Sequence, residues 1–241
     1  MNNRFSSMAG AWCVAAVAIL FATAVNVHAD GLPLRPILDL DGTWSFRLDP
    51  ENRGEEERWF SPPSAFPSTI EVPGAWDAQG FGEETEKLEH NHVGKGWYQR
   101  QITVPESWRG RKIFLCFGGV YREAKVWVNG TYAGQHLGYI SDFEFDITPF
   151  VQPGTASEIV VQVDSEQRWS EDALQGCMDI IDHFFTSWGG IWSHVSMEAR
   201  SPAWLDDLFV APRTDLGGCT VHAAVMGDAN LAARVDVTIT N

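Results

Sequence analysis

The chain has 241 residues, 44% of them hydrophobic, and its 32 acidic residues against 17 lysines and arginines give a formal net charge of −15. This length allows one large or two small domains, and the acidity argues against a nucleic-acid partner, because such a surface repels phosphate groups. The chain also lacks a phosphate loop, a dinucleotide-binding fingerprint and metal-ligand spacing, so we expect no cofactor and no metal.

The first 29 residues have the pattern of a signal peptide. Arg4 provides a positive start, residues 8–25 are almost wholly apolar, and Val27-His28-Ala29 is a small-residue cleavage pattern. The alternative is an uncleaved membrane anchor, since the apolar run approaches the length that spans a bilayer. The alanine-rich run and the cleavage pattern favour removal, which predicts a periplasmic or secreted protein with no membrane contact after cleavage.

From Asp30 onward the sequence predicts β-strands and no long helix. Short runs of strand-forming residues recur about every ten residues between Gly, Pro, Asn and Asp, which is typical of a sandwich or barrel. The charged segment 51–58 fits either a short helix or a solvated loop. The predicted strands are residues 43–48, 68–72, 97–104, 111–117, 123–128, 131–136, 143–147, 158–164, 192–199, 205–211, 219–226 and 232–240.

The clearest strand pattern lies in residues 124–163. Residues 124–128 and 143–147 each alternate between the two faces of a strand. Asn129-Gly130, directly after the first of them, is the strongest short-range signal for a type I′ hairpin turn, because both central residues need positive φ. After prolines at 149 and 153, the apolar residues 159–163 predict a buried strand.

Six short motifs follow one another along the chain: Leu40-Asp41-Gly42-Thr43-Trp44, Val72-Pro73-Gly74-Ala75-Trp76, Trp97-Tyr98-Gln99-Arg100, Val126-Trp127-Val128-Asn129-Gly130, Phe143-Glu144-Phe145-Asp146-Ile147-Thr148 and Trp188-Gly189-Gly190-Ile191-Trp192. In this order they resemble the N-terminal sugar-binding domain of glycoside hydrolase family 2, the family of β-galactosidases, β-glucuronidases and β-mannosidases. Any one motif is weak evidence, but six in the family's order argue against a chance match.

The resemblance implies an all-β protein in two parts. Residues 30–201 would form a jelly-roll, galactose-binding-like β-sandwich, and residues 202–241 the first strands of an immunoglobulin-like β-sandwich, with the boundary near Ser201-Pro202. An immunoglobulin-like sandwich needs about seven strands, whereas residues 205–241 supply three predicted strands. We therefore expect the chain to be a fragment or truncated reading of a longer enzyme.

The resemblance also implies a retaining β-glycosidase that acts on a β-linked glycan or glycoside. Such enzymes use two carboxyl groups about 5–5.5 Å apart, one as acid/base and one as nucleophile. In the family both lie in a later barrel domain. We therefore expect no catalytic residue in this chain, an intramolecular contact with that absent barrel, and no activity of the chain alone.

Residues 177–191 form the best candidate for sugar contact, since they combine carboxylates, a histidine, aromatic residues and a Gly pair. In the related glycosidases this loop contributes an Asp to the terminal sugar. By that resemblance Asp182 is the first candidate for substrate binding and Asp179 the second, while Trp188 is a candidate for stacking on the sugar ring. The alternative is that the carboxylates merely solvate or cap the loop and that the tryptophan packs in the core.

Two positions depart from the family's pattern. The family usually has an Arg shortly after Gly-Ile, whereas here Trp192-Ser193-His194 follows Gly190-Ile191. Ala75 stands where some β-galactosidases have a substrate-binding Asn, which argues against a β-galactosidase.

The sequence also allows other hypotheses, one about a metal site and two about the function. His90 and His92 lie among glutamates, but their irregular spacing fits an acidic loop better than a metal site. The alternatives to the glycosidase are a free-standing secreted carbohydrate-binding module and an exported structural domain that has lost its site.

Overall fold

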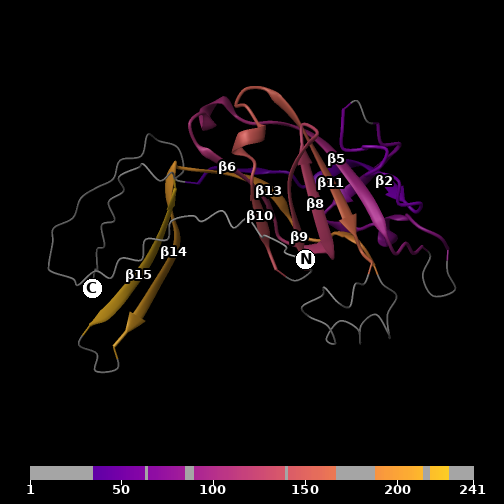
Figure 1. Cartoon of the computed structure of the whole chain (residues 1–241). Coiled ribbons are helices and arrows are strands. Elements are labelled where there is room, and N and C mark those ends of the chain that lie inside the picture. Colours follow the sequence, from indigo (N-terminus) through magenta and orange to yellow (C-terminus); the bar gives the residue numbers. More distant parts are fainter. Residues whose placement is uncertain are drawn as a thin grey trace, which may run out of the picture. The chain divides into compact units, whose positions relative to one another are not determined.

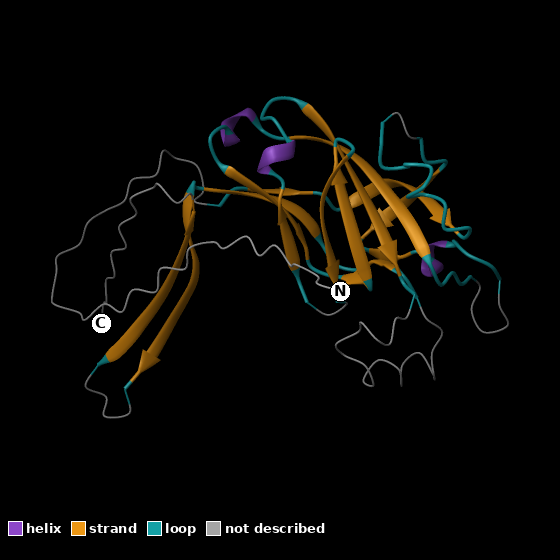
Figure 2. Ribbon diagram, in the orientation of Figure 1, coloured by secondary structure: helices purple, strands orange, loops and turns teal. Residues whose placement is uncertain are grey.

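The computed structural model describes residues 35–62, 65–84, 90–138, 141–166, 188–213 and 218–227. The chain divides into two compact units, one formed by Arg35–Ala199 and one whose described residues are 200–213 and 218–227. Figures 1 and 2 show that strands dominate both. None of the helices within the described ranges is long and apolar enough to cross a membrane.

The larger unit contains a six-stranded sheet whose neighbouring strands are all antiparallel. Its long central strands carry the alternating patterns that predict strands in the sequence. In sheet order the strands are β3 (Ser68–Val72), β2 (Gly42–Asp49), β5 (Lys95–Thr103), β11 (Ala156–Asp164), β8 (Glu123–Val128) and β9 (Thr131–Leu137).

Two smaller sheets complete the larger unit. The four-stranded sheet has the order β1 (Ile37–Asp39), β13 (Val195–Arg200), β6 (Lys112–Phe117) and β10 (Phe143–Asp146). The three-stranded sheet has the order β4 (Gly74–Ala75), β12 (Gly190–Ile191) and β7 (Val120–Tyr121). Short 3₁₀ helices, seen at the ends of the sheets in Figure 2, are η1 (Asp77–Gln79), η2 (Glu106–Trp108) and η3 (Thr148–Phe150).

One hydrophobic core joins the six-stranded and four-stranded sheets. Alternate residues of β2, β5, β8 and β11 meet the inward side chains of β6 and β13, as expected when two sheets pack face to face. The core includes Trp44, Phe46, Tyr98, Ile113, Leu115, Val126, Ile159, Val161, Val195 and Met197. The predicted all-β sandwich is therefore confirmed.

The six-stranded sheet carries a second, aromatic cluster on its other face. Trp97 stacks on Trp127, with ring centroids 5.3 Å apart, and Trp59 packs edge-on against Trp97 at 5.9 Å. Asp49 fixes the covering turn, because its carboxylate accepts hydrogen bonds from the backbone N–H groups of Arg53 and Gly54 and from Trp97 Nε1, at 2.7–3.0 Å. The charged segment 51–58 thus forms turns over this cluster instead of a helix.

A buried carboxylate lies on the same outward face of β11. Glu158 Oε2 accepts hydrogen bonds from Gln99 Nε2 and Gln101 Nε2, each at 2.9 Å. Burial raises the pKa of Glu158 above its ordinary value of 4.5, against the lowering effect of the two amide hydrogen bonds. The folded chain therefore binds this proton more tightly than the unfolded chain does.

Glu158→Gln is expected to stabilise the protein at neutral pH and to have less effect in acid. Because the pKa is raised in the folded state, the contribution of Glu158 to stability is fully present below pH 4.5 and is lost as the pH rises through the folded-state pKa. A glutamine at position 158 keeps an oxygen that accepts hydrogen bonds from Gln99 and Gln101, and because it does not ionise it removes the loss of stability at higher pH. Urea denaturation at about pH 4 and about pH 7 measures the change. Glu56→Gln, the same charge change on an exposed side chain, is the control, and equal effects of both substitutions at both pH values would contradict the prediction.

The hairpin predicted at Asn129-Gly130 is confirmed, with φ of 50° and 77°. The Asn side chain does more than allow the turn, since its Nδ2 donates to Phe150 O at 2.8 Å and its Oδ1 accepts from Glu158 N at 2.9 Å. The hairpin is thereby tied to η3 and β11.

Most strand predictions are confirmed within two residues, and the differences are local. The strand expected over 192–199 begins at Val195, and the short strands β1, β4, β7 and β12 are not in the prediction. Cys116 of β6 is half-buried, and its Sγ lies 3.9 Å from Glu144 Oε2. The strand expected over 232–240 lies outside the described residues.

The smaller unit contains an antiparallel pair, β14 (Ala203–Pro212) and β15 (Cys219–Gly227), with a bulge between Leu205 and Asp207. Its side chains include the exposed Leu208, Phe209 and Val210. The boundary near Ser201-Pro202 and the immunoglobulin-like character of this unit stay predictions.

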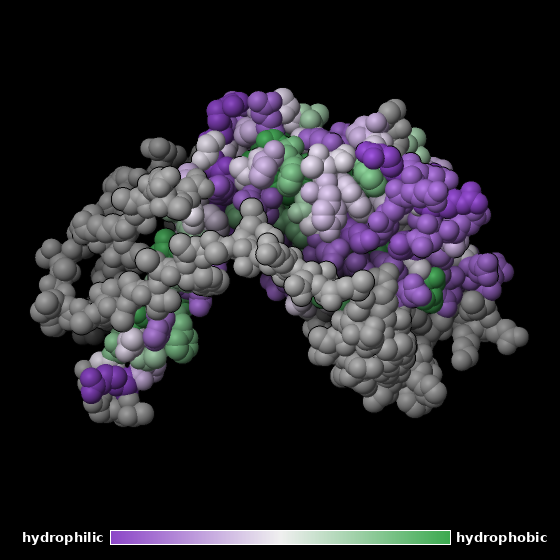
Figure 3. Space-filling model, viewed as in Figure 1, coloured by the Kyte–Doolittle hydropathy of each residue, from purple (hydrophilic) through white to green (hydrophobic). Residues whose placement is uncertain are grey.

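In the space-filling view, the visible described surface of the chain is mostly hydrophilic, in keeping with the high net charge (Figure 3).

Candidate functional site

Of the three predicted site residues, the structure describes one. Asp179 and Asp182 lie outside the described residues, within 167–187. Trp188 is described and half-buried, and its indole stacks on Tyr121 of β7 with ring centroids 4.5 Å apart and planes 25° apart. One face of Trp188 is therefore covered by protein. The site is best described through the residues on either side of segment 167–187, which we call the first anchor (Asp164–Ser165) and the second anchor (Trp188–Gly189).

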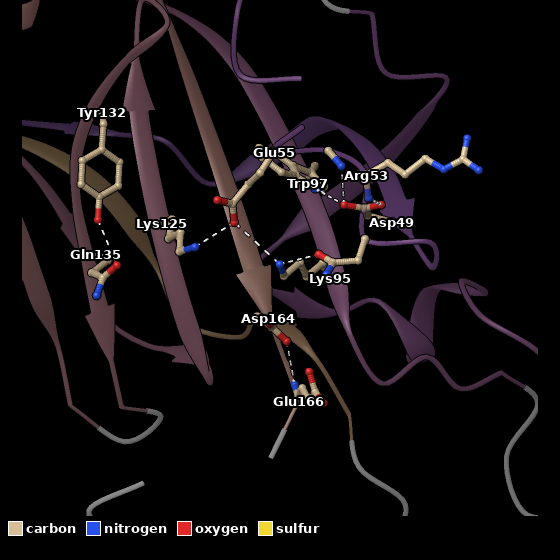
Figure 4. Close-up of polar contacts among 12 residues, drawn as sticks. Asp49, Arg53, Glu55, Lys95, Trp97, Lys125, Tyr132, Gln135, Asp164 and Glu166 are labelled. Carbon is tan, nitrogen blue, oxygen red and sulfur yellow. Dashed lines mark hydrogen bonds and ion pairs between the residues drawn. The ribbon is translucent and has the colours of Figure 1, made fainter. Parts of the chain in front are cut away.

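The first anchor is fixed at the end of β11. Ser165 N donates to Gly94 O at 2.9 Å, and Gly94 N donates to Ser165 Oγ at 3.1 Å. Arg122 N donates to Asp164 O at 3.0 Å, and Asp164 Oδ1 accepts from Glu166 N at 2.9 Å, a contact drawn in Figure 4. Strand β11 thus reaches its last residue with its backbone hydrogen bonds made.

The second anchor is fixed by a buried carboxylate. Asp77 Oδ2 accepts a hydrogen bond from Gly189 N at 3.0 Å, and Asp77 Oδ1 accepts one from His92 N at 3.0 Å. Burial raises the pKa of Asp77, and the backbone hydrogen bonds from His92 and Gly189 oppose that rise. A single side chain therefore connects residues 77, 92 and 189.

Trp76 completes the second anchor. Its backbone N–H donates to Gly189 O at 2.9 Å, and its Nε1 donates to His92 O at 3.1 Å. The indole is fully buried. Trp76 belongs to one of the motifs that resemble the family, whereas Asp77 is not among the predicted site residues, although a carboxylate directly after that motif is a visible signal.

The Gly pair at residues 189 and 190 is required by close packing. A Cβ on Gly189 would lie 1.9 Å from the Trp76 ring, and a Cβ on Gly190 would lie 2.6 Å from Gly74 O. Gly190 also has a φ of +137°, which other residues rarely adopt. The backbone leaves segment 167–187 by passing directly over the Trp76 ring.

His92 lies between the two anchors. Its backbone N–H and carbonyl bind Asp77 and Trp76, and its Nε2 lies 3.2 Å from the carbonyl oxygen of Lys95, the first residue of β5. His90 Nδ1 lies 3.5 Å from Gly82 O. Within the described ranges no group of three or more His, Cys, Asp or Glu side chains is arranged to hold a metal ion.

His194 forms an ion pair near the position where the family pattern has an arginine. Its Nδ1 lies 2.5 Å from Asp41 Oδ2, and Asp41 Oδ1 accepts a hydrogen bond from Val195 N at 2.9 Å. The hydrogen bond and the charge of Asp41 raise the pKa of His194. At this departure from the family pattern, the chain thus has a histidine whose protonated form Asp41 favours. Ala75, the other departure, lies in β4 and pairs with Gly190.

Comparisons with known proteins agree on one family. Residues 37–201 match the model for the sugar binding domain of glycosyl hydrolases family 2. The β-glucuronidase of Paenibacillus borealis is 34% identical over 199 residues, which cover 76% of this chain and 32% of that protein. The dog β-glucuronidase is 33% identical over 161 residues, 62% of this chain and 24% of that protein. The chain thus spans about a third or less of the length of these relatives.

A solved structure supports the fold. The β-glucuronidase of Ruminococcus gnavus superimposes with a TM-score of 0.68 and 24% identity over 85% of this chain and 34% of that chain. At this identity the likeness shows that the strands are arranged in the same way, and it does not by itself identify a substrate.

Proposed function

We propose, because this chain belongs to glycosyl hydrolase family 2, that its sugar-binding domain serves a retaining β-glycosidase of the β-glucuronidase type. The observation that carries the proposal is the pair of anchors. Residues 167–187, with Asp179 and Asp182, follow Ser165, which bonds Gly94, and precede Gly189, which Asp77 and Trp76 link to His92. Two fixed ends suit a segment that presents side chains to a ligand.

The proposed role is to orient the terminal sugar while other residues do the chemistry. Retaining hydrolysis needs an acid/base and a nucleophilic carboxyl group about 5–5.5 Å apart, which we assign to a catalytic barrel outside these 241 residues. Asp182, with Asp179 as the second candidate, accepts hydrogen bonds from sugar hydroxyls. Trp188 stacks on the sugar with the face that Tyr121 leaves uncovered. Correct placement of the reacting bond is itself a large part of catalysis.

The substrate that we propose for the complete enzyme is a β-glucuronide. The two relatives above are β-glucuronidases, and Ala75 replaces an Asn found in some β-galactosidases. Both points favour a β-glucuronide as the substrate of the complete enzyme, in the periplasm or outside the cell.

The purified 241-residue chain is expected to bind methyl β-D-glucuronide weakly and to hydrolyse nothing. Saturation-transfer NMR measures the binding, which should be lost in Asp182→Ala and kept in Asp206→Ala, an exposed carboxylate of the smaller unit. Release of 4-nitrophenol from the aryl β-glucuronide or β-galactoside, compared with an empty-vector preparation, measures the hydrolysis. Turnover above that background, or glucuronide binding unaffected by Asp182→Ala, would contradict the proposal. Binding of a neutral oligosaccharide that Asp182→Ala leaves unchanged would instead favour a free-standing carbohydrate-binding module.

A further inference from the structure

A shallow pocket of about 360 Å³ lies on the outer face of the six-stranded sheet, away from the core between the sheets. Its residues come from the turn after β2 and from strands β8 and β9. They are Glu55, Phe60, Lys125, Trp127, Tyr132 and Gln135. None belongs to segment 167–187 or to its anchors, so the pocket is a separate feature of the molecule.

The floor and one wall of the pocket are aromatic and rigid. Trp127 is buried beneath Phe60, with ring centroids 4.9 Å apart and planes 6° apart, and it meets Tyr132 edge-on at 5.7 Å. Tyr132 is 47% exposed. Its hydroxyl donates to Gln135 Oε1 at 3.1 Å, which fixes the ring in an orientation that points toward Gln135 (Figure 4). A flat aromatic face is therefore presented to solvent in one orientation.

The opposite side of the pocket carries a paired donor and acceptor. Lys125 Nζ lies 2.7 Å from Glu55 Oε1, and Lys95 Nζ lies 3.7 Å from the same oxygen (Figure 4). Burial raises the pKa of Glu55, but hydrogen bonding and the charges of the lysines outweigh it and lower the pKa below the ordinary value. Glu55 is thus ionised at neutral pH. It follows the turn fixed by Asp49, so the position of its backbone is set by the fold.

We propose that this pocket binds one neutral pyranose residue of a glycan, with the apolar face of the sugar on Tyr132 and its hydroxyls on Glu55, Lys125 and Gln135. An aromatic face beside a few polar groups is the composition of a small-ligand site. A carboxylate, an ammonium and an amide together accept from and donate to hydroxyl groups. The site is independent of the proposed glucuronide contact through Asp182.

The charges of the pocket select against other occupants. The positive charges of Lys125 and Lys95 are balanced by the negative charges of Glu55 and of Glu123, which acts on Tyr132, and the whole chain carries −15, so an anionic ligand such as a uronate gains little there. A purely apolar ligand would bury the ion pair without replacing its contacts with water, which is unfavourable. Hydroxyl groups replace those contacts, which leaves a neutral sugar as the best match.

Titration of the ¹⁵N-labelled chain with methyl β-D-glucopyranoside and methyl β-D-galactopyranoside tests the proposal. We expect saturable shifts of the backbone amides of residues 125, 132 and 135 with at least one of the two, and a dissociation constant in the millimolar range. Tyr132→Ala should weaken binding at least tenfold, and Glu55→Gln should weaken it severalfold. Leu137→Ala, an equally exposed position on the same strand, is the matched control and should change nothing.

Three results would overturn the proposal. They are the absence of shifts at these amides up to about 50 mM of either glycoside, equal loss of binding in Leu137→Ala and Tyr132→Ala, and tighter binding of methyl β-D-glucuronide than of the neutral glycosides at these amides. Asp182→Ala should leave the shifts unchanged. Failure at this pocket and failure at Asp182 are therefore distinguishable in the same titration.

Discussion

Asp77→Ala is expected to lower the free energy of unfolding by about 3 kcal/mol, since it leaves two backbone N–H groups without an acceptor in a buried region. The two donors, His92 N and Gly189 N, lie in parts of the chain that are far apart in the sequence, and the neighbouring Trp76 also contacts both of them. Urea denaturation measures the loss. Amide hydrogen exchange should also show faster exchange at residues 92 and 189 than in the parent protein.

Asp146→Ala is the matched control for this prediction. Its carboxylate is exposed and accepts one local hydrogen bond, from Thr148 N at 2.9 Å. An exposed cap of this kind contributes about 1 kcal/mol or less. Equal losses from the two substitutions would show that Asp77 acts only as another polar side chain. A selective loss at Asp77 would establish it as the residue that fixes the second anchor, and with it one end of the segment that contains Asp182.

The long strands could be predicted from the sequence because each has one face in the core. Residues 124–128 alternate, and the structure places Val126 inside the sandwich and Trp127 outside it. The same alternation does not reveal that the outer face has a cluster of its own. Trp127 is buried there by Phe60 and Trp97, which come from other strands and turns. Periodicity thus identifies faces of a strand, whereas tertiary contacts decide what covers them.

The anchors could not be predicted because their contacts have no local pattern. Strand β12 has two residues, too few for any periodicity, and it pairs with β4 and β7 through backbone atoms alone. Asp77 and Gly189 are 112 positions apart. The family resemblance draws attention to Gly189-Gly190 as a motif, but only the structure gives the reason for it, which is the ring of Trp76. The pocket at Tyr132 likewise combines residues from three separate elements.

Gly189→Ala is expected to destabilise the protein by about 3 kcal/mol, although its φ is not among the positive values that disfavour other residues. The cause is steric. The new Cβ would lie 1.9 Å from Trp76 Cζ2, in the six-membered ring of the indole. That ring is fully buried and packs beside Phe46, with ring centroids 6.2 Å apart, so it cannot shift without disturbing the core. Chemical denaturation measures the loss.

Gly110→Ala separates this steric effect from backbone strain. Gly110 has a φ of +79° and nothing within 4 Å of its added Cβ, so alanine there should cost about 1 kcal/mol through strain alone. Trp76→Phe provides the complementary test, because phenylalanine lacks the part of the ring that the Gly189 Cβ would meet. In that background Gly189→Ala should cost less than in the parent by about 1 kcal/mol or more. Additive losses would mean that the Gly pair is required for the path of the backbone and not for Trp76. A smaller cost of Gly189→Ala in the Trp76→Phe background would mean that the tryptophan of one family motif is the reason for the glycine of another. The two motifs would then form a single structural unit at the end of segment 167–187.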